Sequence, residues 1–242
     1  MAFLRCDYRS NSLVMSTSFC AILPEDKPLK DSNVVYLLHG LSDNCTNWER
    51  YTSVERYAME HGIAVIMPEV QRSFYTDMNL GLKYFEFVSK ELREEVHHLF
   101  NLPTAKAKNY VMGLSMGGYG ALKCALTYPN RYNGCAAFSP AVDVREIYEN
   151  GPKIKKNEMQ AIYGDSVKNK DDIFYLVNKV KKAPFIYLAC GESDFIFSHT
   201  QRLDNALQAK GLDYKYEHWD GIHDWAFWDE AVKRAFNLFF SK

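Results

Sequence analysis

The sequence predicts an α/β fold with a mostly parallel central sheet and helices on both faces. Short apolar runs recur along the chain, and segments of helical period separate most of them. Near-continuous apolar runs are typical of parallel strands, because such strands are buried on both faces. The 242 residues are 47% hydrophobic, which is enough for one sizeable core. Residues 1–242 are therefore predicted to form a single domain.

The elements are expected in a regular order up to the middle of the chain. Strands are predicted at 3–9, 12–23, 34–39, 63–67, 109–114, 134–138, 184–190 and 214–219. Helices are predicted at 48–60, at 80–100, from the residues after 115 to Pro129, and at 225–240. Helical spacing within 80–100 favours a core-facing stripe, formed by Leu82, Phe85, Leu92, Val96 and Leu99. Residues 140–183 have no clean period and are expected to be irregular.

The segment 109–122, NYVMGLSMGGYGAL, is an apolar run that leads through Gly113, Ser115 and Gly117 into small helix-forming residues. This is the pattern of a nucleophile elbow, in which a sharp turn between strand and helix exposes a serine hydroxyl. Glycines are expected at 113 and 117 because the turn brings backbone segments too close together for a Cβ atom. Ser115 is the predicted nucleophile.

An elbow serine requires an acid after a later strand. The apolar run 184–190 leads into Gly191-Glu192-Ser193-Asp194, a turn-rich loop that places carboxylates at the strand's C-terminal end. Asp194 is the predicted acid. Glu192 remains an alternative, but it lies closer to the strand, and its longer side chain would need a different loop path.

A histidine must follow the acid, and three do. His218 lies in the alternating strand 214–219, where a structural role is expected. His199 follows Asp194 closely and is expected on the next helix. His223 lies between the last strand and the last helix, the position that the order Ser, Asp, His requires, so it is the predicted base.

Two backbone N–H groups are needed to stabilise an oxyanion, one from the residue after the nucleophile and one from an earlier loop. Met116 supplies the first. The second is assigned to Leu41, because the strand 34–39 ends in a glycine-containing loop. His39, at the end of that strand, is expected to make a structural hydrogen bond to the loop.

These residues carry a family resemblance. The matching pieces span most of the chain: LLHGLSDNCTNW at 37–48, GLSMGGYGALK at 113–123, YPNRY at 128–132, CGESDF at 190–195 and GIHDW at 221–225. The chain resembles the esterase D and S-formylglutathione hydrolase group of α/β-hydrolases, and within it most of all the short tributyrin esterases of bacteria. The resemblance implies the α/β-hydrolase fold and hydrolysis of small acyl esters. It also implies Ser115, Asp194 and His223 as the triad, with Leu41 and Met116 as the oxyanion amides.

In α/β-hydrolases the segment after the strand 134–138 often forms part of a lid, and here residues 140–183 are a short insert in place of a large lid. A modest cover favours an open, shallow pocket that suits short acyl chains. The aromatic residues in or beside the catalytic loops are candidates for its lining, although core positions are equally consistent with the sequence: Trp48, Tyr75, Tyr119 and Trp225.

The composition excludes several partners. The net charge is −1, with 29 basic and 30 acidic residues, so neither nucleic acid nor a membrane is an expected partner. The N-terminus lacks the form of a signal peptide, and the six cysteines show no CxxC pair, so reduced cysteines and a cytoplasmic location are expected. No metal or organic cofactor is predicted, because no HExxH motif or comparable ligand cluster appears. The oligomeric state stays open, a homo-oligomer included.

The expected reaction is hydrolysis of a small-molecule carboxylic ester through an acyl-enzyme. Three other interpretations stay open: a thioesterase acting on S-formylglutathione, an acetylxylan or feruloyl esterase acting on carbohydrate esters, and a binding protein that has kept the fold.

Overall fold

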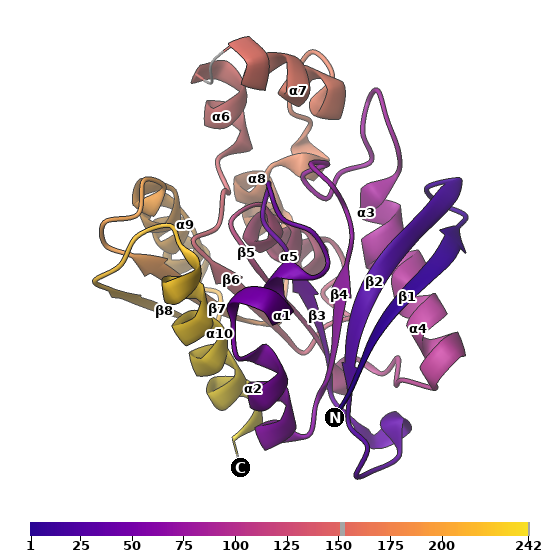
Figure 1. Cartoon of the computed structure of the whole chain (residues 1–242). Helices are drawn as coiled ribbons and strands as arrows, with labels where there is room; N and C mark the ends of the chain where they lie inside the picture. The colour runs from indigo at the N-terminus through magenta and orange to yellow at the C-terminus, as the bar shows by residue number, and fades with distance from the viewer. Residues whose placement is uncertain (151–152, 242) are drawn as a thin grey trace.

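The computed structural model of the chain describes residues 1–150 and 153–241. Eight strands form one sheet in the order β1-β2-β4-β3-β5-β6-β7-β8, which is antiparallel at β1 and β2 and parallel from β4 to β8 (Figure 1). The strands are β1 (Ala2–Ser10), β2 (Met15–Leu23), β3 (Val34–Leu38), β4 (Ala64–Pro68), β5 (Asn109–Leu114), β6 (Gly134–Phe138), β7 (Phe185–Gly191) and β8 (Tyr214–Trp219). Every predicted strand is present.

Helices cover both faces of the sheet. They are α1 (Asn47–Tyr51), α2 (Val54–His61), α3 (Tyr84–Glu86), α4 (Leu92–Phe100), α5 (Met116–Thr127), α6 (Val144–Asn150), α7 (Lys153–Tyr163), α8 (Ile173–Lys179), α9 (Phe197–Lys210) and α10 (Trp225–Phe240). Helices α1, α2 and α10 pack on one face, and α4, α5, α8 and α9 pack on the other (Figure 1). This is the α/β-hydrolase fold, as predicted.

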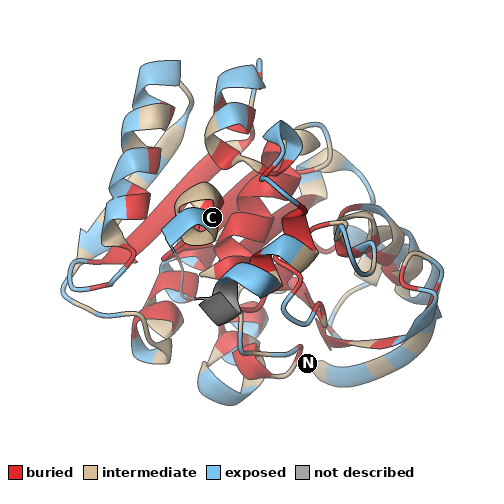
Figure 2. Ribbon diagram, turned by 90° about the horizontal axis from the view of Figure 1, so that it is seen from above, coloured by how far each residue is buried: buried red, intermediate tan, exposed pale blue. Residues whose placement is uncertain are grey.

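The core has two parts because successive residues of a strand face opposite sides of the sheet. In β3, Val35 and Leu37 join the cluster under α2 and α10, whereas Val34, Tyr36 and Leu38 join the cluster under α5. Viewed from above, the buried strands form a central band between helices whose outer faces are exposed (Figure 2). Both faces of the sheet are therefore withdrawn from water, which explains the continuous apolar runs in the sequence.

Two predicted helices differ from the structure. The helix expected at 48–60 is interrupted at Thr52 and Ser53, where the Ser53 N–H donates to the Asp229 carboxylate of α10 at 2.8 Å. The helix expected at 80–100 begins at Tyr84 and passes through a π-helical turn, Phe87–Glu91, before α4. Tertiary contacts of this kind leave no periodic signal in the sequence.

The insert, residues 140–183, is not irregular. It contains α6, α7 and α8, and α6 and α7 stand beyond the carboxyl ends of the parallel strands (Figure 1). Asp172 caps α8 by accepting hydrogen bonds from the N–H groups of Phe174 and Tyr175. The sequence pattern missed these helices because each described one is short and turn residues separate them.

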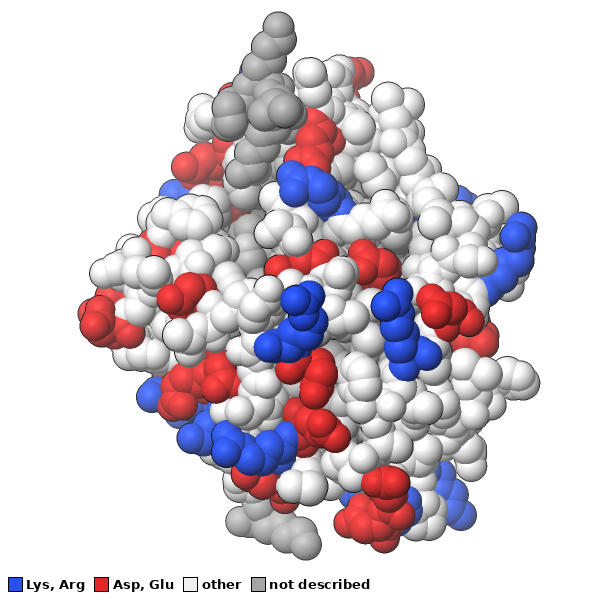
Figure 3. All heavy atoms as spheres, in the orientation of Figure 1, with Lys and Arg blue, Asp and Glu red and all other residues white. Residues whose placement is uncertain are grey.

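The structure also describes the state of the cysteines, the lengths of the helices and the distribution of surface charge. All six cysteines are free thiols, and five of them are buried. No helix within 1–150 and 153–241 is both long and apolar enough to cross a bilayer. Basic and acidic side chains are interspersed on the face shown in Figure 3.

Candidate active site

Ser115 lies at a sharp turn between β5 and α5. Its backbone is in an unusual conformation for a residue with a side chain, with φ 51° and ψ −115°. A Cβ atom at Gly113 would lie 2.4 Å from the Gly117 carbonyl oxygen, and one at Gly117 would lie 2.3 Å from the Leu38 carbonyl oxygen. Both distances are too short for real atoms, so the elbow requires glycine at these two positions.

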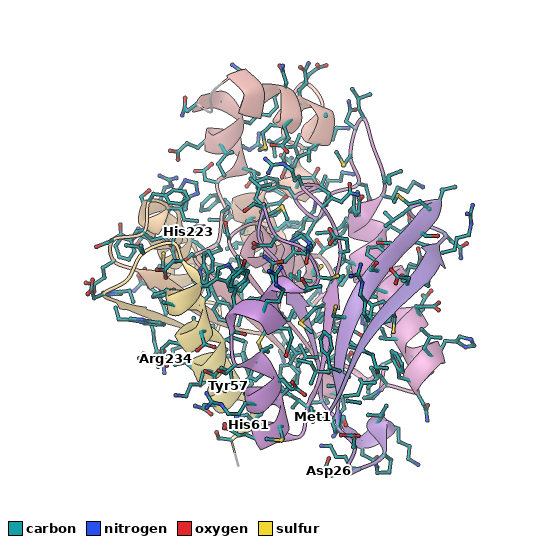
Figure 4. All side chains as sticks on the ribbon, in the orientation of Figure 1. Met1, Asp26, Tyr57, His61, His223 and Arg234 are labelled. Carbon is teal, nitrogen blue, oxygen red and sulfur yellow. The ribbon has the colours of Figure 1, made fainter. Side chains whose placement is uncertain are left out.

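The structure brings together the three side chains that the chain order selected. The Ser115 hydroxyl lies 3.0 Å from His223 Nε2, and His223 Nδ1 lies 2.8 Å and 3.0 Å from the two carboxylate oxygens of Asp194. With Nδ1 protonated toward the carboxylate, Nε2 accepts the hydrogen bond from the serine. His223 lies in the loop that precedes α10, on the side of the molecule toward α6 (Figure 4).

Asp194 is buried behind His223, with 5% of its surface exposed. Burial opposes its ionisation, but hydrogen bonds from His223 and from the Ile196 N–H outweigh burial and hold the pKa of Asp194 below its usual value. The carboxylate is therefore ionised near neutral pH. An ionised carboxylate at this place holds the imidazole in one tautomer and one orientation.

Glu192, the alternative acid, does not contact His223. It lies on the surface and pairs with His218, with 2.8 Å between the carboxylate and Nδ1. His218 is in β8, as expected. These two histidine–carboxylate pairs are close together in sequence, and of the two it is the buried pair that reaches Ser115.

The ring of His223 is held between two aromatic side chains. Its centroid lies 4.5 Å from that of Phe195 and 4.9 Å from that of Trp228. Neither residue was predicted from the sequence. Phe195 directly follows the predicted acid and is 76% exposed, and Trp228 lies one turn into α10. Their closeness in sequence to Asp194 and His223 could have indicated that they contact the histidine ring.

A cavity of about 600 Å³ opens above Ser115. Leu41 and Met116, the predicted oxyanion residues, line it together with Ser115 and His223. Helix α6 contributes Glu146, Ile147 and Asn150. The insert therefore contributes part of the cavity lining.

Of the four aromatic candidates for the pocket, only Trp225 lines the cavity. Trp48, Tyr75 and Tyr119 are core residues with 1%, 0% and 0% of their surface exposed. Their polar atoms donate to backbone carbonyls of Leu38, His39 and Asp171, respectively, which is how a buried polar aromatic residue is satisfied. The sequence correctly placed these residues beside the catalytic loops but could not tell which way their rings point.

Two further histidines lie near the site. His39 is buried and makes the structural hydrogen bond expected of it, donating from Nδ1 to the Gly40 carbonyl at 2.7 Å. His199 is on α9, as expected, and lines the cavity. Burial and the neighbouring Arg202 lower the pKa of His199, so this side chain is neutral near pH 7. Among the hydrogen bonds of the described residues, none joins His39 or His199 to Ser115.

No group of three His, Cys, Asp or Glu side chains in the described part of the chain is arranged to hold a metal ion.

The fold and the site define the class: the protein is a serine hydrolase of the α/β-hydrolase fold. Residues 10–239 match the family model described as "Putative esterase", and the chain belongs to this esterase family. The chain is 35% identical to the acetyl esterase of Caldicellulosiruptor saccharolyticus, over 98% of this chain and 97% of that relative.

Two solved structures from Staphylococcus aureus are similar over the whole chain. One is a fluorophosphonate-binding serine hydrolase with substrate bound, at a TM-score of 0.93 and 33% identity, covering 100% of this chain and 99% of the other. The second is an S-formylglutathione hydrolase, at a TM-score of 0.90 and 33% identity, covering 99% of both chains. The predicted relationship to the esterase D and S-formylglutathione hydrolase group is confirmed, and the protein is a carboxylic ester hydrolase.

Proposed function

We propose that the protein hydrolyses short-chain acyl esters of neutral alcohols, with Ser115 as nucleophile, His223 as base and Asp194 as the acid that orients it. The observation that carries this proposal is the continuous chain of hydrogen bonds from the Ser115 hydroxyl through His223 to Asp194, with links of 3.0 Å and 2.8 Å. A serine hydroxyl is a weak nucleophile unless a base removes its proton during attack. The elbow holds the hydroxyl where His223 reaches it.

Acylation begins when His223 Nε2 takes the Ser115 proton as the serine oxygen attacks the ester carbonyl. The tetrahedral intermediate collapses, the C–O bond to the alcohol breaks, and His223 gives the proton to the departing alcohol. Water then attacks the acyl-serine ester as His223 takes its proton, the C–O bond to Ser115 breaks, His223 returns the proton to the serine oxygen, and the carboxylic acid leaves. Asp194 stays ionised throughout and stabilises the imidazolium.

The oxyanion that forms in both steps needs preorganised donors. The proposed donors are the backbone N–H groups of Leu41 and Met116. Met116 is the first residue of α5, so its N–H is at the positive end of the helix dipole. Both residues line the cavity beside Ser115, which supports the assignment.

The charge of the cavity favours neutral esters. The ionisable residues among its described lining are the acids Asp43, Glu146 and Asp224 and the histidines His199 and His223. A glutathione thioester carries two carboxylates and one ammonium, a net negative charge, and would face mainly acidic side chains here, of which Glu146 is paired with Arg202. The acetyl esterase that matches 98% of the chain likewise supports a small acyl group on an oxygen ester.

S-formylglutathione hydrolysis is the second candidate, because one of the similar S. aureus structures is such an enzyme. Steady-state kinetics with p-nitrophenyl acetate, p-nitrophenyl butyrate and S-formylglutathione separate the two. The proposal expects the oxygen esters to have the higher kcat/KM. A kcat/KM that is higher for the glutathione thioester would make the second candidate the function.

The first prediction concerns the nucleophile. Ser115→Ala should retain the fold and lose activity by about 10⁶-fold, because removing a triad nucleophile leaves only the catalysis that binding and the oxyanion amides supply. Ser198→Ala is the matched control, since Ser198 is exposed on α9 and outside the cavity lining. Mass spectrometry after a fluorophosphonate probe should show labelling of the wild type and the control only. A folded Ser115→Ala protein that keeps more than a few per cent of activity would refute the role of the elbow.

A further inference from the structure

The loop that carries the proposed Leu41 amide is held by a neighbouring segment, residues 69–76, whose backbone is unusual. Phe74 and Tyr75 are consecutive residues in the left-handed region, with φ 48° and φ 47°. Aromatic residues rarely adopt this conformation, and two in succession persist only where the surroundings enforce it. Such strain is often found beside functional sites.

The strained segment is anchored from the elbow helix α5. Lys123, which is 1% exposed, donates from Nζ to the Tyr75 carbonyl at 3.2 Å and to the Thr76 hydroxyl at 2.9 Å. Its charge is balanced by Asp171 at 2.6 Å. The Tyr75 ring also packs directly on Gly120 of α5, where a Cβ atom would lie 2.5 Å from the ring. The helix that follows Ser115 therefore fixes Tyr75 from two sides.

Tyr75 in turn holds the end of β3. Its ring is fully buried, and its hydroxyl donates to the His39 carbonyl at 2.9 Å. The His39 side chain then donates from Nδ1 to the Gly40 carbonyl at 2.7 Å, while its Nε2 accepts from the Val70 N–H at 3.1 Å. The Val70 contact requires Nε2 to be unprotonated, so the proton of the neutral ring is on Nδ1.

These contacts, together with a hydrogen bond from the Asp43 N–H to the Gly40 carbonyl at 3.3 Å, fix the direction of the Leu41 amide. A trans peptide is planar, and its C=O and N–H point in opposite directions. The Gly40 carbonyl and the Leu41 N–H belong to the same peptide, so the His39 side chain that holds the carbonyl also aims the N–H. The backbone carbonyl of His39 accepts the hydrogen bond from the Tyr75 hydroxyl, so Tyr75 also fixes the backbone from which the His39 side chain extends.

We propose that Tyr75 is a positioning residue for ester hydrolysis, which acts through His39 to aim the Leu41 N–H at the developing oxyanion. This inference rests on the proposed function. Tyr75 does not line the cavity, so the loss of its hydroxyl leaves the contacts of the ground-state substrate intact. The amide matters most when negative charge develops on the carbonyl oxygen. The effect therefore falls on kcat and leaves KM unchanged.

The test is Tyr75→Phe, which removes one hydroxyl. We expect kcat for p-nitrophenyl acetate to fall on the order of tenfold, less than the loss of an entire oxyanion donor, with KM within about twofold of wild type. The affinity for an alkyl boronic acid, whose adduct with serine is tetrahedral, should fall by the same factor as kcat.

Tyr57→Phe is the matched control. Tyr57 is also buried and donates a 2.9 Å hydrogen bond, to Asp229, but it lies on α2 on the opposite face of the sheet, far from His223 (Figure 4). It should keep wild-type kcat even if its melting temperature falls. A Tyr75→Phe protein with wild-type kcat and boronate affinity would overturn the proposal, as would equal losses of kcat in the two variants.

A second variant covers the case in which Tyr75→Phe does not fold. Thr76→Val removes the hydroxyl that Lys123 contacts and keeps Tyr75 itself. It should show a smaller fall in kcat with KM unchanged, and unchanged kcat would count against the proposal. Ser115→Ala separates the two levels: activity in that variant refutes the proposed function, whereas an inactive Ser115→Ala with normal Tyr75→Phe and Thr76→Val refutes only this inference.

Discussion

Asp194 and Glu192 are two residues apart, and each pairs with a histidine, yet their surroundings give them different roles. Asp194 is 5% exposed and its hydrogen bonds keep it ionised in a buried place, whereas the Glu192–His218 pair is in solvent. Exposed ion pairs contribute little to stability, and they do not hold a ring in one orientation. Burial is thus the property that separates the two carboxylates.

The second prediction concerns these two carboxylates. Asp194→Asn should lower kcat on the order of 10⁴-fold, because the amide favours the wrong tautomer of His223. Glu192→Gln should change kcat little, since Glu192 contacts His218 and not His223. Both kcat values are compared in proteins with matching circular dichroism. The reverse ranking would make Glu192 the acid.

Individual site residues differ in how far the sequence could predict them. The positions of Ser115, Asp194 and His223 follow from chain order and turn residues, because the carboxyl ends of parallel strands share one edge of the sheet. The direction of a ring does not follow from chain order. Tyr75 lies beside the site, but its left-handed backbone and the anchor from Lys123 turn it into the core, and no sequence pattern reports such a contact.

At the scale of elements, the strands could be predicted to within a few residues because burial on both faces produces apolar runs. The helices of the insert could not. Helix α6 is held by ion pairs with distant residues: Arg202 of α9 pairs with Asp143 and Glu146, and Arg145 pairs with Asp172. Short helices are marginal on their own and form when tertiary contacts stabilise them.

A similar long-range contact leads to the third prediction. Glu91, in the π-helical turn before α4, accepts hydrogen bonds from the N–H groups of Asn11 and Ser12 at 2.8 Å and 2.7 Å, which ties the β1–β2 turn to the helix. Glu91→Gln should lower the free energy of unfolding by about 1 kcal/mol at pH 7, because the amide NH₂ cannot accept the second hydrogen bond. Glu94→Gln, at an exposed position of α4, is the control.

The pH dependence of this contribution has a definite sign. Burial opposes ionisation, but the hydrogen bonds from Ser12 and Asn11 outweigh it and lower the pKa of Glu91 from its ordinary 4.5. A carboxylate whose pKa is lowered in the folded state stabilises that state at pH values above its ordinary pKa. This stabilisation is lost as the pH falls through the lowered pKa. Urea unfolding from pH 7 to pH 3 should therefore show the difference between wild type and Glu91→Gln shrinking below about pH 4.5. A constant difference would show that ionisation of Glu91 is not its source.

For the whole molecule, the site is assembled from distant parts of one sheet edge. Leu41 follows β3, Ser115 follows β5, Asp194 follows β7 and His223 follows β8. The insert then closes the cavity from above with α6. In the proposed function this arrangement separates two tasks, because the sheet edge holds the proposed reacting groups while α6 contributes side chains that line the cavity.

The size and polarity of that cover lead to the fourth prediction. Helix α6 contributes Ile147 to the cavity between two polar residues, Glu146 and Asn150. Each methylene that is buried against apolar atoms gains roughly 0.8 kcal/mol, and a methylene placed beside a carboxylate or an amide gains little. The kcat/KM for p-nitrophenyl esters from acetate to decanoate should therefore peak at acyl chains of about two to four carbons. A maximum at octanoate or beyond would show a deep apolar cavity and contradict this interpretation of the insert.

A change in the polarity of the α6 lining should move the maximum. Asn150→Leu replaces one polar lining group with an apolar one and should raise kcat/KM for hexanoate relative to acetate by roughly fourfold for each methylene that the new side chain covers. Glu149→Leu is the matched control, because Glu149 is the preceding residue of α6 and does not line the cavity. An equal shift in both variants would point to a general effect of surface hydrophobicity. A shift in Asn150→Leu alone would place the acyl chain beneath α6, so that the cap sets acyl specificity while the sheet edge carries the chemistry.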